Sequence, residues 1–245
     1  MPNHQQLDNI THKNLRVLTH HHPNFGDTTS YSRLFISEFR YAQGDYPILF
    51  RKNSETGQFE AIALFGFAVE ENLFLDDNGW HANYIPLAIQ RRPFLIGFEP
   101  GSQETQGEPK AVVHIDMDSP RISESEGEAV FLEQGGQSPY LQQVSSVLNA
   151  IHQGDTETRA FIDTLLHYEL IESVSIKVKL QDGSNNELSS LYSINEEKLT
   201  SLAADAVYSL YQRGYMQHIY MVMASMAAMS HLIELKNKQI SSTDV

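Results

Sequence analysis

One stretch of the chain collects the residue types best suited to recognising a ligand. Residues 79–98 hold the only tryptophan, Trp80, two adjacent arginines, Arg91 and Arg92, and two further aromatic residues, Tyr84 and Phe94. A guanidinium in apolar surroundings needs partners, and an arginine can hold a carboxylate through two parallel hydrogen bonds. Two interpretations stand. Either the rings contact a flat or peptide-like ligand while an arginine binds its carboxylate, or the stretch is a corner of the core whose arginines pair with neighbouring acids and carbonyls.

Histidines and carboxylates give a second, metal-binding hypothesis. His20, His21 and His22 precede Asp27, while His114 and Asp116 would share one face of a strand. With His21 from elsewhere, His114 and Asp116 would form a two-histidine, one-carboxylate site of the kind that suits iron. Adjacent histidines rarely point at one metal, so we expect no cofactor and keep this metal site as the minor alternative.

Other kinds of catalysis find little support. The chain has no cysteine, no Gly-x-Ser-x-Gly elbow, and no phosphate-binding or dinucleotide-binding glycine motif. Carboxylates such as Glu38, Glu70 and Glu71 occur, but their spacing gives no reason to pair them. The sequence therefore favours a non-enzymatic protein over an enzyme.

Net charge and hydropathy exclude some classes of binding partner. The 245 residues carry a formal net charge of −14 with only 17 Lys and Arg, which argues against nucleic acid and anionic lipid. Residues 1–16 contain no apolar run typical of a signal peptide, so we expect a soluble, cytoplasmic protein. Residues 214–233 lack formal charges over the length of a membrane span, but their Gln, His and Ser side chains indicate a buried helix.

The first half of the chain is predicted to be rich in strands. We expect strands near residues 15–18, 94–98 and 111–116, and a hairpin formed by 46–51 and 59–69. A short helix is expected over residues 84–91 and should end before Pro93, because proline disfavours helical backbone in the preceding residue.

The second half changes to helical periodicity. Ser138-Pro139 is typical of a helix start, Gly154 of its end, and Asp155 of a second helix start. Residues 174–180 alternate as a strand and predict a β-hairpin that continues through Tyr192. Helices from Asn195 to Gly214 and over residues 215–233 would form a terminal αα-hairpin.

These patterns predict an α+β fold: a strand-rich N-terminal half packed with a helical C-terminal half that includes one β-hairpin and a terminal αα-hairpin. No linker of low complexity divides the chain. We therefore expect a polar N-terminal arm over residues 1–30 and one domain over 31–245, with residues 119–136 as the place for any further boundary.

Short segments along nearly the whole chain also match a known family in order. They are residues 12–16, 37–39, 46–48, 71–74, 79–80, 84–86, 91–94, 115–116, 138–141 and 213–215. In this order they resemble the SapC family of bacterial proteins, not the peptide-transport permease of similar name. The resemblance implies a protein without an established activity. Some members are linked to a surface layer, and related genes neighbour halogenase-like genes.

The sequence thus favours a binding or accessory protein for a peptide, a partner protein or a small aromatic molecule. The resemblance implies that this protein works beside halogenase-like tailoring enzymes. Glu38 and Tyr46, which lie in segments that carry the resemblance, join Trp80, Tyr84, Arg91, Arg92 and Phe94 as ligand-binding candidates. Two alternatives stay open: a metal-dependent tailoring enzyme, and a factor for surface-layer assembly or export.

Overall fold

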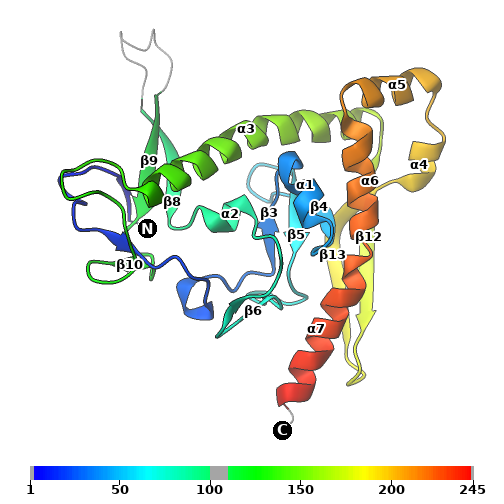
Figure 1. Ribbon diagram of the computed structural model, residues 1–245. Helices are drawn as coiled ribbons and strands as arrows, with labels where there is room; N and C mark the ends of the chain where they lie inside the picture. Colours follow the sequence, from blue (N-terminus) through cyan, green and yellow to red (C-terminus); the bar gives the residue numbers. More distant parts are fainter. Residues whose placement is uncertain (1–2, 100–109, 244–245) are drawn as a thin grey trace. The chain divides into compact units, whose positions relative to one another are not determined.

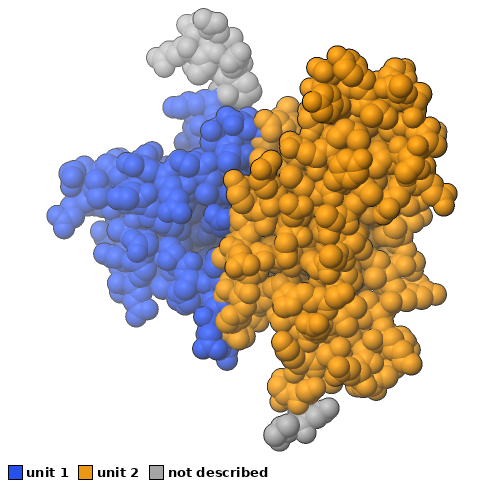
Figure 2. Space-filling model, turned by 45° about the vertical axis from the view of Figure 1, so that its right-hand side comes forward, with its two compact units in different colours: residues 1–27, 77–79, 87–153 blue, residues 28–76, 80–86, 154–245 orange. Residues whose placement is uncertain are grey.

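The computed structural model describes residues 3–99 and 110–243 (Figure 1). Contacts divide the chain into two compact units (Figure 2). Unit 1 comprises residues 1–27, 77–79 and 87–153, and unit 2 comprises residues 28–76, 80–86 and 154–245. Short strands dominate the first half and helices dominate the second, so the predicted α+β class is confirmed.

Unit 1 is built on a three-stranded antiparallel sheet in the order β1-β9-β8. Its strands are β1 His4–Gln6, β9 Lys110–Asp116 and β8 Phe94–Glu99. Phe94 lies opposite Ile115 in the register, and both are fully buried, so this face of the sheet meets the core. Because side chains alternate along a strand, Leu95, His114 and Asp116 share the opposite face.

A second small sheet of unit 1 has β2 Arg16–Val17 between β10 Ile122–Ser123 and β11 Glu128–Ala129. Gly127, just before β11, has a φ of +89°, and a Cβ there would lie 2.3 Å from the Val17 carbonyl oxygen. Only glycine allows this approach, because any side chain would collide with the backbone of β2. The remaining unit 1 elements before the long helix are η1 Pro23–Phe25 and α2 Leu87–Gln90.

Helix α3 spans Pro139–His167, and the division between the units falls inside it. Ser138 Oγ accepts the Leu141 N–H at 3.1 Å, which confirms the predicted start. Its first turns contribute to the unit 1 core, which comprises Leu15, Val17, Phe94, Ile115, Val130, Leu141, Val144 and Leu148.

The predicted helix end at Gly154 is wrong, since α3 continues through it. In unit 2 a Cβ at Gly154 would lie 2.9 Å from the Phe35 Cβ, so this glycine permits close packing rather than ending a helix. Asp155, expected to cap a new helix, instead forms ion pairs with Arg33 and with Arg159, the latter at 3.0 Å.

Unit 2 contains a five-stranded antiparallel sheet in the order β12-β13-β4-β5-β3. The strands are β3 Tyr31–Arg33, β4 Ile48–Lys52, β5 Phe59–Leu64, β12 Ile171–Lys179 and β13 Asn185–Ile194. Both predicted hairpins are confirmed, with Ile48 opposite Ala63 and Ile171 opposite Ile194. The sequence did not indicate that β13 pairs with β4, which joins strands from both halves of the chain in one sheet.

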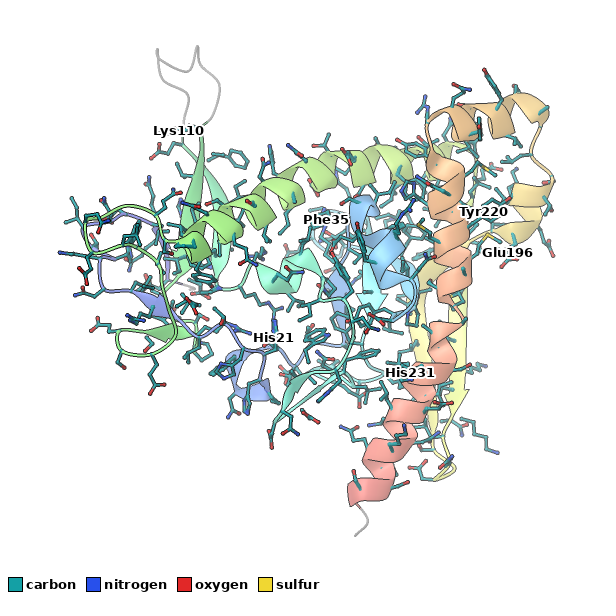
Figure 3. All side chains as sticks on the ribbon, in the orientation of Figure 1. His21, Phe35, Lys110, Glu196, Tyr220 and His231 are labelled. Atoms are coloured by element: carbon teal, nitrogen blue, oxygen red, sulfur yellow. The ribbon has the colours of Figure 1, made fainter. Side chains whose placement is uncertain are left out.

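Helices α6 Tyr215–Ser225 and α7 Ala228–Thr243 run along β12 and β13 (Figure 1). Ile219 and Val222 of α6 are fully buried, and Ser225 Oγ accepts the Ile48 N–H at 2.8 Å. Figure 3 labels two side chains of this helix pair: Tyr220 is 53% exposed, whereas the His231 ring lies 6.0 Å from that of Phe74. The predicted last helix is therefore present, but it bends after Ser225.

The other predicted helices are shorter than expected. The helix predicted over residues 84–91 is reduced to α2, and the one from Asn195 to Gly214 is divided into α4 Glu196–Thr200 and α5 Ala204–Gln212. The predicted cap is confirmed, because Asn195 Oδ1 accepts the Lys198 N–H at 2.8 Å. The division follows Ser201, whose hydroxyl bonds the Lys198 carbonyl, and such local bonds compete with regular helix.

The remaining elements of the chain are η2 Ile36–Glu38, α1 Phe39–Ala42, β6 Leu75–Asp76 and β7 Gly79–Trp80. In the part of the chain that the structure describes, no helix has the length and apolar character needed to cross a membrane.

Candidate ligand-binding site

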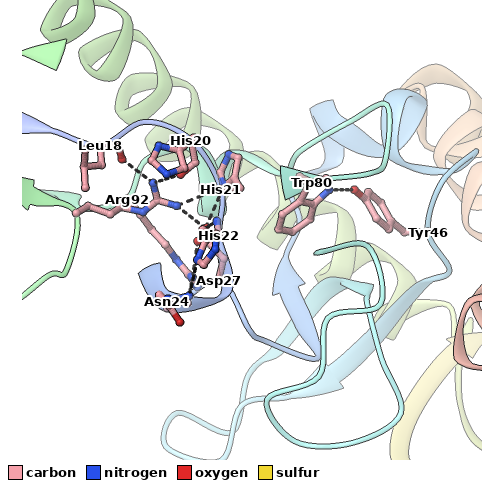
Figure 4. A network of polar contacts seen from close by, with 11 residues as sticks. Leu18, His20, His21, His22, Asn24, Asp27, Tyr46, Trp80 and Arg92 are labelled. Carbon is pink, nitrogen blue, oxygen red and sulfur yellow. Dashed lines mark hydrogen bonds and ion pairs between the residues drawn. The ribbon is translucent and has the colours of Figure 1, made fainter. Parts of the chain in front are cut away.

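A fully buried aspartate, Asp27, is bonded to the histidine-rich loop at the end of the first segment of unit 1. Asp27 is 0% exposed and accepts hydrogen bonds from His21 Nδ1 at 3.2 Å, from the His22 N–H at 3.3 Å and from Arg121 Nη2. Arg92 Nη1 lies 3.5 Å from the same carboxylate (Figure 4). Burial opposes ionisation, but His21 and the charge of Arg121 outweigh it and hold the pKa of Asp27 below its ordinary value.

Arg121, which the sequence did not single out, is the main partner of this aspartate. It is 2% exposed and also donates to the carbonyls of Leu18 and His20, each at 2.8 Å. The guanidinium thus fixes both the carboxylate and the backbone of the histidine run. Arg121 lies 94 positions from Asp27, so no local pattern could have indicated the pair.

The two candidate arginines lie in the turn that joins α2 to β8. The Arg91 and Arg92 N–H groups donate to the carbonyls of Leu87 at 3.0 Å and Ile89 at 3.1 Å, which continues α2 into this turn. Phe94, the third candidate here, is fully buried and belongs to the unit 1 core.

Arg91 and Arg92 line a surface pocket of about 300 Å³, here called the arginine pocket, whose other walls include His4, Leu95, Asp116 and Asp118. Arg91 Nη1 donates to the Phe94 carbonyl at 2.6 Å, and Arg92 Nη1 to the Gly26 carbonyl at 2.6 Å. Among the described residues no carboxylate pairs with Arg91.

The environment of both arginines disfavours positive charge. Burial lowers the pKa of Arg91, and the neighbouring charge of Arg92 lowers it further. Burial also lowers the pKa of Arg92, although Asp27 opposes this effect. A half-buried guanidinium next to a second one is a place where an added negative charge would be stabilising.

The other four candidates meet in unit 2 as a hydrogen-bonded network. Trp80 Nε1 donates to Tyr46 Oη at 2.9 Å (Figure 4). Tyr46 Oη donates in turn to the Tyr84 carbonyl. Tyr84 Oη donates to Glu38 Oε1 at 2.8 Å, while Glu38 Oε2 accepts the Phe35 N–H at 2.8 Å. Burial raises the pKa of both phenols, and the charge of Glu38 raises that of Tyr84 further, so both stay protonated donors.

The structure therefore sorts the seven candidates into two groups. Arg91, Arg92 and Phe94 belong to unit 1, whereas Glu38, Tyr46, Trp80 and Tyr84 belong to unit 2. Tyr46 and Glu38 are buried, while Trp80 and Tyr84 are half-buried. The ring of Tyr84 stacks on that of Tyr41, with centroids 5.6 Å apart, and Tyr41 is 64% exposed. Sequence reasoning did not single out Tyr41.

The residues of the alternative metal site have other neighbours. His21 contacts Asp27 and Arg121, and the His114 ring lies over Gly97, where a Cβ would come within 2.6 Å of its Nε2. Asp116 lies opposite His4 in the sheet. Within residues 3–99 and 110–243, no group of three His, Asp or Glu is placed to hold a metal ion.

The sequence pattern of the SapC family matches residues 7–232, nearly the whole chain. The chain belongs to the SapC family. No curated protein and no solved structure matches it. The matched residues include the network around Tyr46 and all residues of the arginine pocket except His4.

Proposed function

We propose that this SapC-family chain is a non-enzymatic binding protein that holds the carboxylate of a peptide, a partner protein or a small aromatic molecule in the arginine pocket. One observation carries the proposal. Arg91 is half-buried beside a second guanidinium, its pKa is lowered, and no described carboxylate pairs with it. A ligand carboxylate would supply the negative charge that Arg91 lacks and would accept two hydrogen bonds from its guanidinium.

The donor geometry supports this role. Nη1 of each arginine donates a hydrogen bond to a backbone carbonyl, and this bond fixes the direction of the guanidinium. Nε and Nη2 of both arginines have no acceptor among the described residues. A guanidinium held in place loses less conformational entropy when it binds, so the fixed pair is suited to recognition.

Unit 2 carries a separate surface of its own for an aromatic ring. The rings of Tyr41 and Tyr84 stack, and Tyr41 stays 64% exposed. Asp45 accepts hydrogen bonds from the Tyr84 N–H and from Asn83 Nδ2, each at 2.8 Å. Trp80, Tyr46 and Glu38 hold Tyr84 in place through the network. We propose that Tyr41 and Tyr84 bind a flat ring by stacking, a contact typically stabilised by about 0.5–1.5 kcal/mol.

The carboxylate proposal is tested by calorimetry on the full chain with four related probes: phenylalanine, its amide, N-acetylphenylalanine and the amide of that compound. We expect each acid to bind more tightly than the amide with the same amino group. Arg91→Gln should remove this preference, while Arg40→Gln, a change at an exposed arginine, should leave it intact. Equal binding of acids and amides by the wild-type protein would contradict the proposal.

The cellular setting is proposed with it. We propose a cytoplasmic protein that works beside halogenase-like tailoring enzymes, which cell fractionation and co-purification would test. Recovery at the cell surface would favour the alternative of a surface-layer assembly or export factor. Stoichiometric iron or zinc in untagged, chelator-washed protein would favour the metal-dependent enzyme.

A further inference from the structure

The arginine pocket carries negative as well as positive charge. Asp116 ends β9, and Asp118 follows in the turn that leads to Ser119 and Pro120, both of which also line the pocket. Asp116 Oδ1 accepts the Asp118 N–H at 3.2 Å, and Asp118 Oδ2 accepts the Asn3 N–H at 3.1 Å. Among the described residues, neither Asp116 Oδ2 nor Asp118 Oδ1 has a donor.

Neither aspartate forms an ion pair with Arg91 or Arg92 in the part of the chain that the structure describes. Backbone carbonyls of Gly26 and Phe94 hold the arginines, and backbone N–H groups bind one oxygen of each aspartate. The lining of the pocket therefore includes guanidinium donors and carboxylate acceptors that are not paired with each other, and this combination suits a molecule with both charges.

We propose that the ligand of this pocket is a zwitterion, with the free α-amino acid as its chemical class. The arginines would hold the carboxylate, and Asp116 and Asp118 would accept hydrogen bonds from the ammonium group. This inference rests on the proposed function for the carboxylate and adds the ammonium. The volume of about 300 Å³ lies at the low end for ligand pockets, and Leu95, Pro93 and Phe25 offer apolar contacts for a side chain.

The four-probe calorimetry separates the two claims, after a screen of the twenty free amino acids has chosen the parent compound. Free amino acid should bind about tenfold or more tightly than its N-acetyl form, because acetylation removes a charge-assisted hydrogen bond. The amide should be weakened to a similar extent by loss of the carboxylate.

Two variants test which residues of the pocket bind the ammonium group and which bind the carboxylate. Asp116→Asn should abolish discrimination between the free and N-acetyl forms while keeping discrimination between acid and amide. Arg91→Gln should do the reverse. Asp163→Asn, at an exposed aspartate elsewhere, is the matched control, and circular dichroism should show all variants folded.

The outcomes are distinguishable. If the N-acetyl acid binds as well as the free amino acid but the amides do not, the zwitterion is overturned and the carboxylate proposal stands. If none of the free amino acids or derivatives binds, both are overturned. The inference is supported if the wild-type protein prefers both the free amino group and the free carboxylate, and if Asp116→Asn loses only the first preference and Arg91→Gln only the second.

Discussion

Asp27 is a fully buried carboxylate of unit 1, and such a group is stable only with its partners. We predict that Asp27→Asn lowers the free energy of unfolding by about 3–5 kcal/mol, because it leaves Arg121 as an uncompensated buried charge. Urea unfolding at pH 7 measures the loss. Asp8→Asn, at a carboxylate nearly half exposed, should have a much smaller effect.

The same residue predicts a pH dependence. The pKa of Asp27 is lower in the folded than in the unfolded chain, so its stabilisation is present above the unfolded pKa of about 3.9 and is lost as pH falls through the folded pKa. The stability difference between wild type and Asp27→Asn should therefore shrink as the pH falls below about 4. A difference that grew on acidification would contradict this prediction, because it would mean that the pKa of Asp27 is higher in the folded than in the unfolded chain.

The hydrogen-bonded network around Tyr46 can be tested at a single residue, with the fluorescence of Trp80 as the probe. Tyr46→Phe removes both the acceptor of the Trp80 indole N–H and the donor to the Tyr84 carbonyl. We expect a loss of about 1–3 kcal/mol and a shift in the emission of Trp80, the only tryptophan. Tyr220→Phe, on the exposed side of α6, should change neither quantity, and an unaltered Tyr46→Phe spectrum would contradict the network.

Among the elements, α3 shows how packing overrides local preference. Gly to Ala inside a helix is usually stabilising by roughly 1 kcal/mol. Gly154→Ala should instead destabilise, because the new Cβ would lie 2.9 Å from the Phe35 Cβ, closer than ordinary contact. Thermal unfolding measures the change.

Gly44→Ala is the matched control for this prediction, since a Cβ at Gly44 meets nothing within 4 Å. It should be neutral or slightly stabilising. If Gly154→Ala raised the melting temperature, the close contact between α3 and Phe35 would be wrong.

At the scale of the whole molecule, the path of the chain argues for one folding unit. Each compact unit takes three separate segments, so the chain passes between units five times, once within α3. Neither unit could be removed by a single cut. We therefore predict a single cooperative transition, with circular dichroism and Trp80 fluorescence melting together. Two separate transitions would contradict this prediction and the proposed single domain over residues 31–245.

The sequence alone determined the features that depend on neighbours along the chain. An apolar run predicted the first hairpin and alternation the second, Ser138 and Asn195 predicted helix starts, and the ordered segments predicted the SapC family. These predictions hold because strand and helix periods and caps are set within a few residues.

Only the tertiary structure decided which distant residues meet. It paired Asp27 with Arg121, joined β13 to β4, carried α3 past Gly154, and separated Arg91 from the Trp80 network into different units. A glycine that ends a helix and one that admits a neighbouring ring have the same local sequence signal. Long-range contacts depend on register and close packing across the fold, so the arginine pocket with its two aspartates became visible only there.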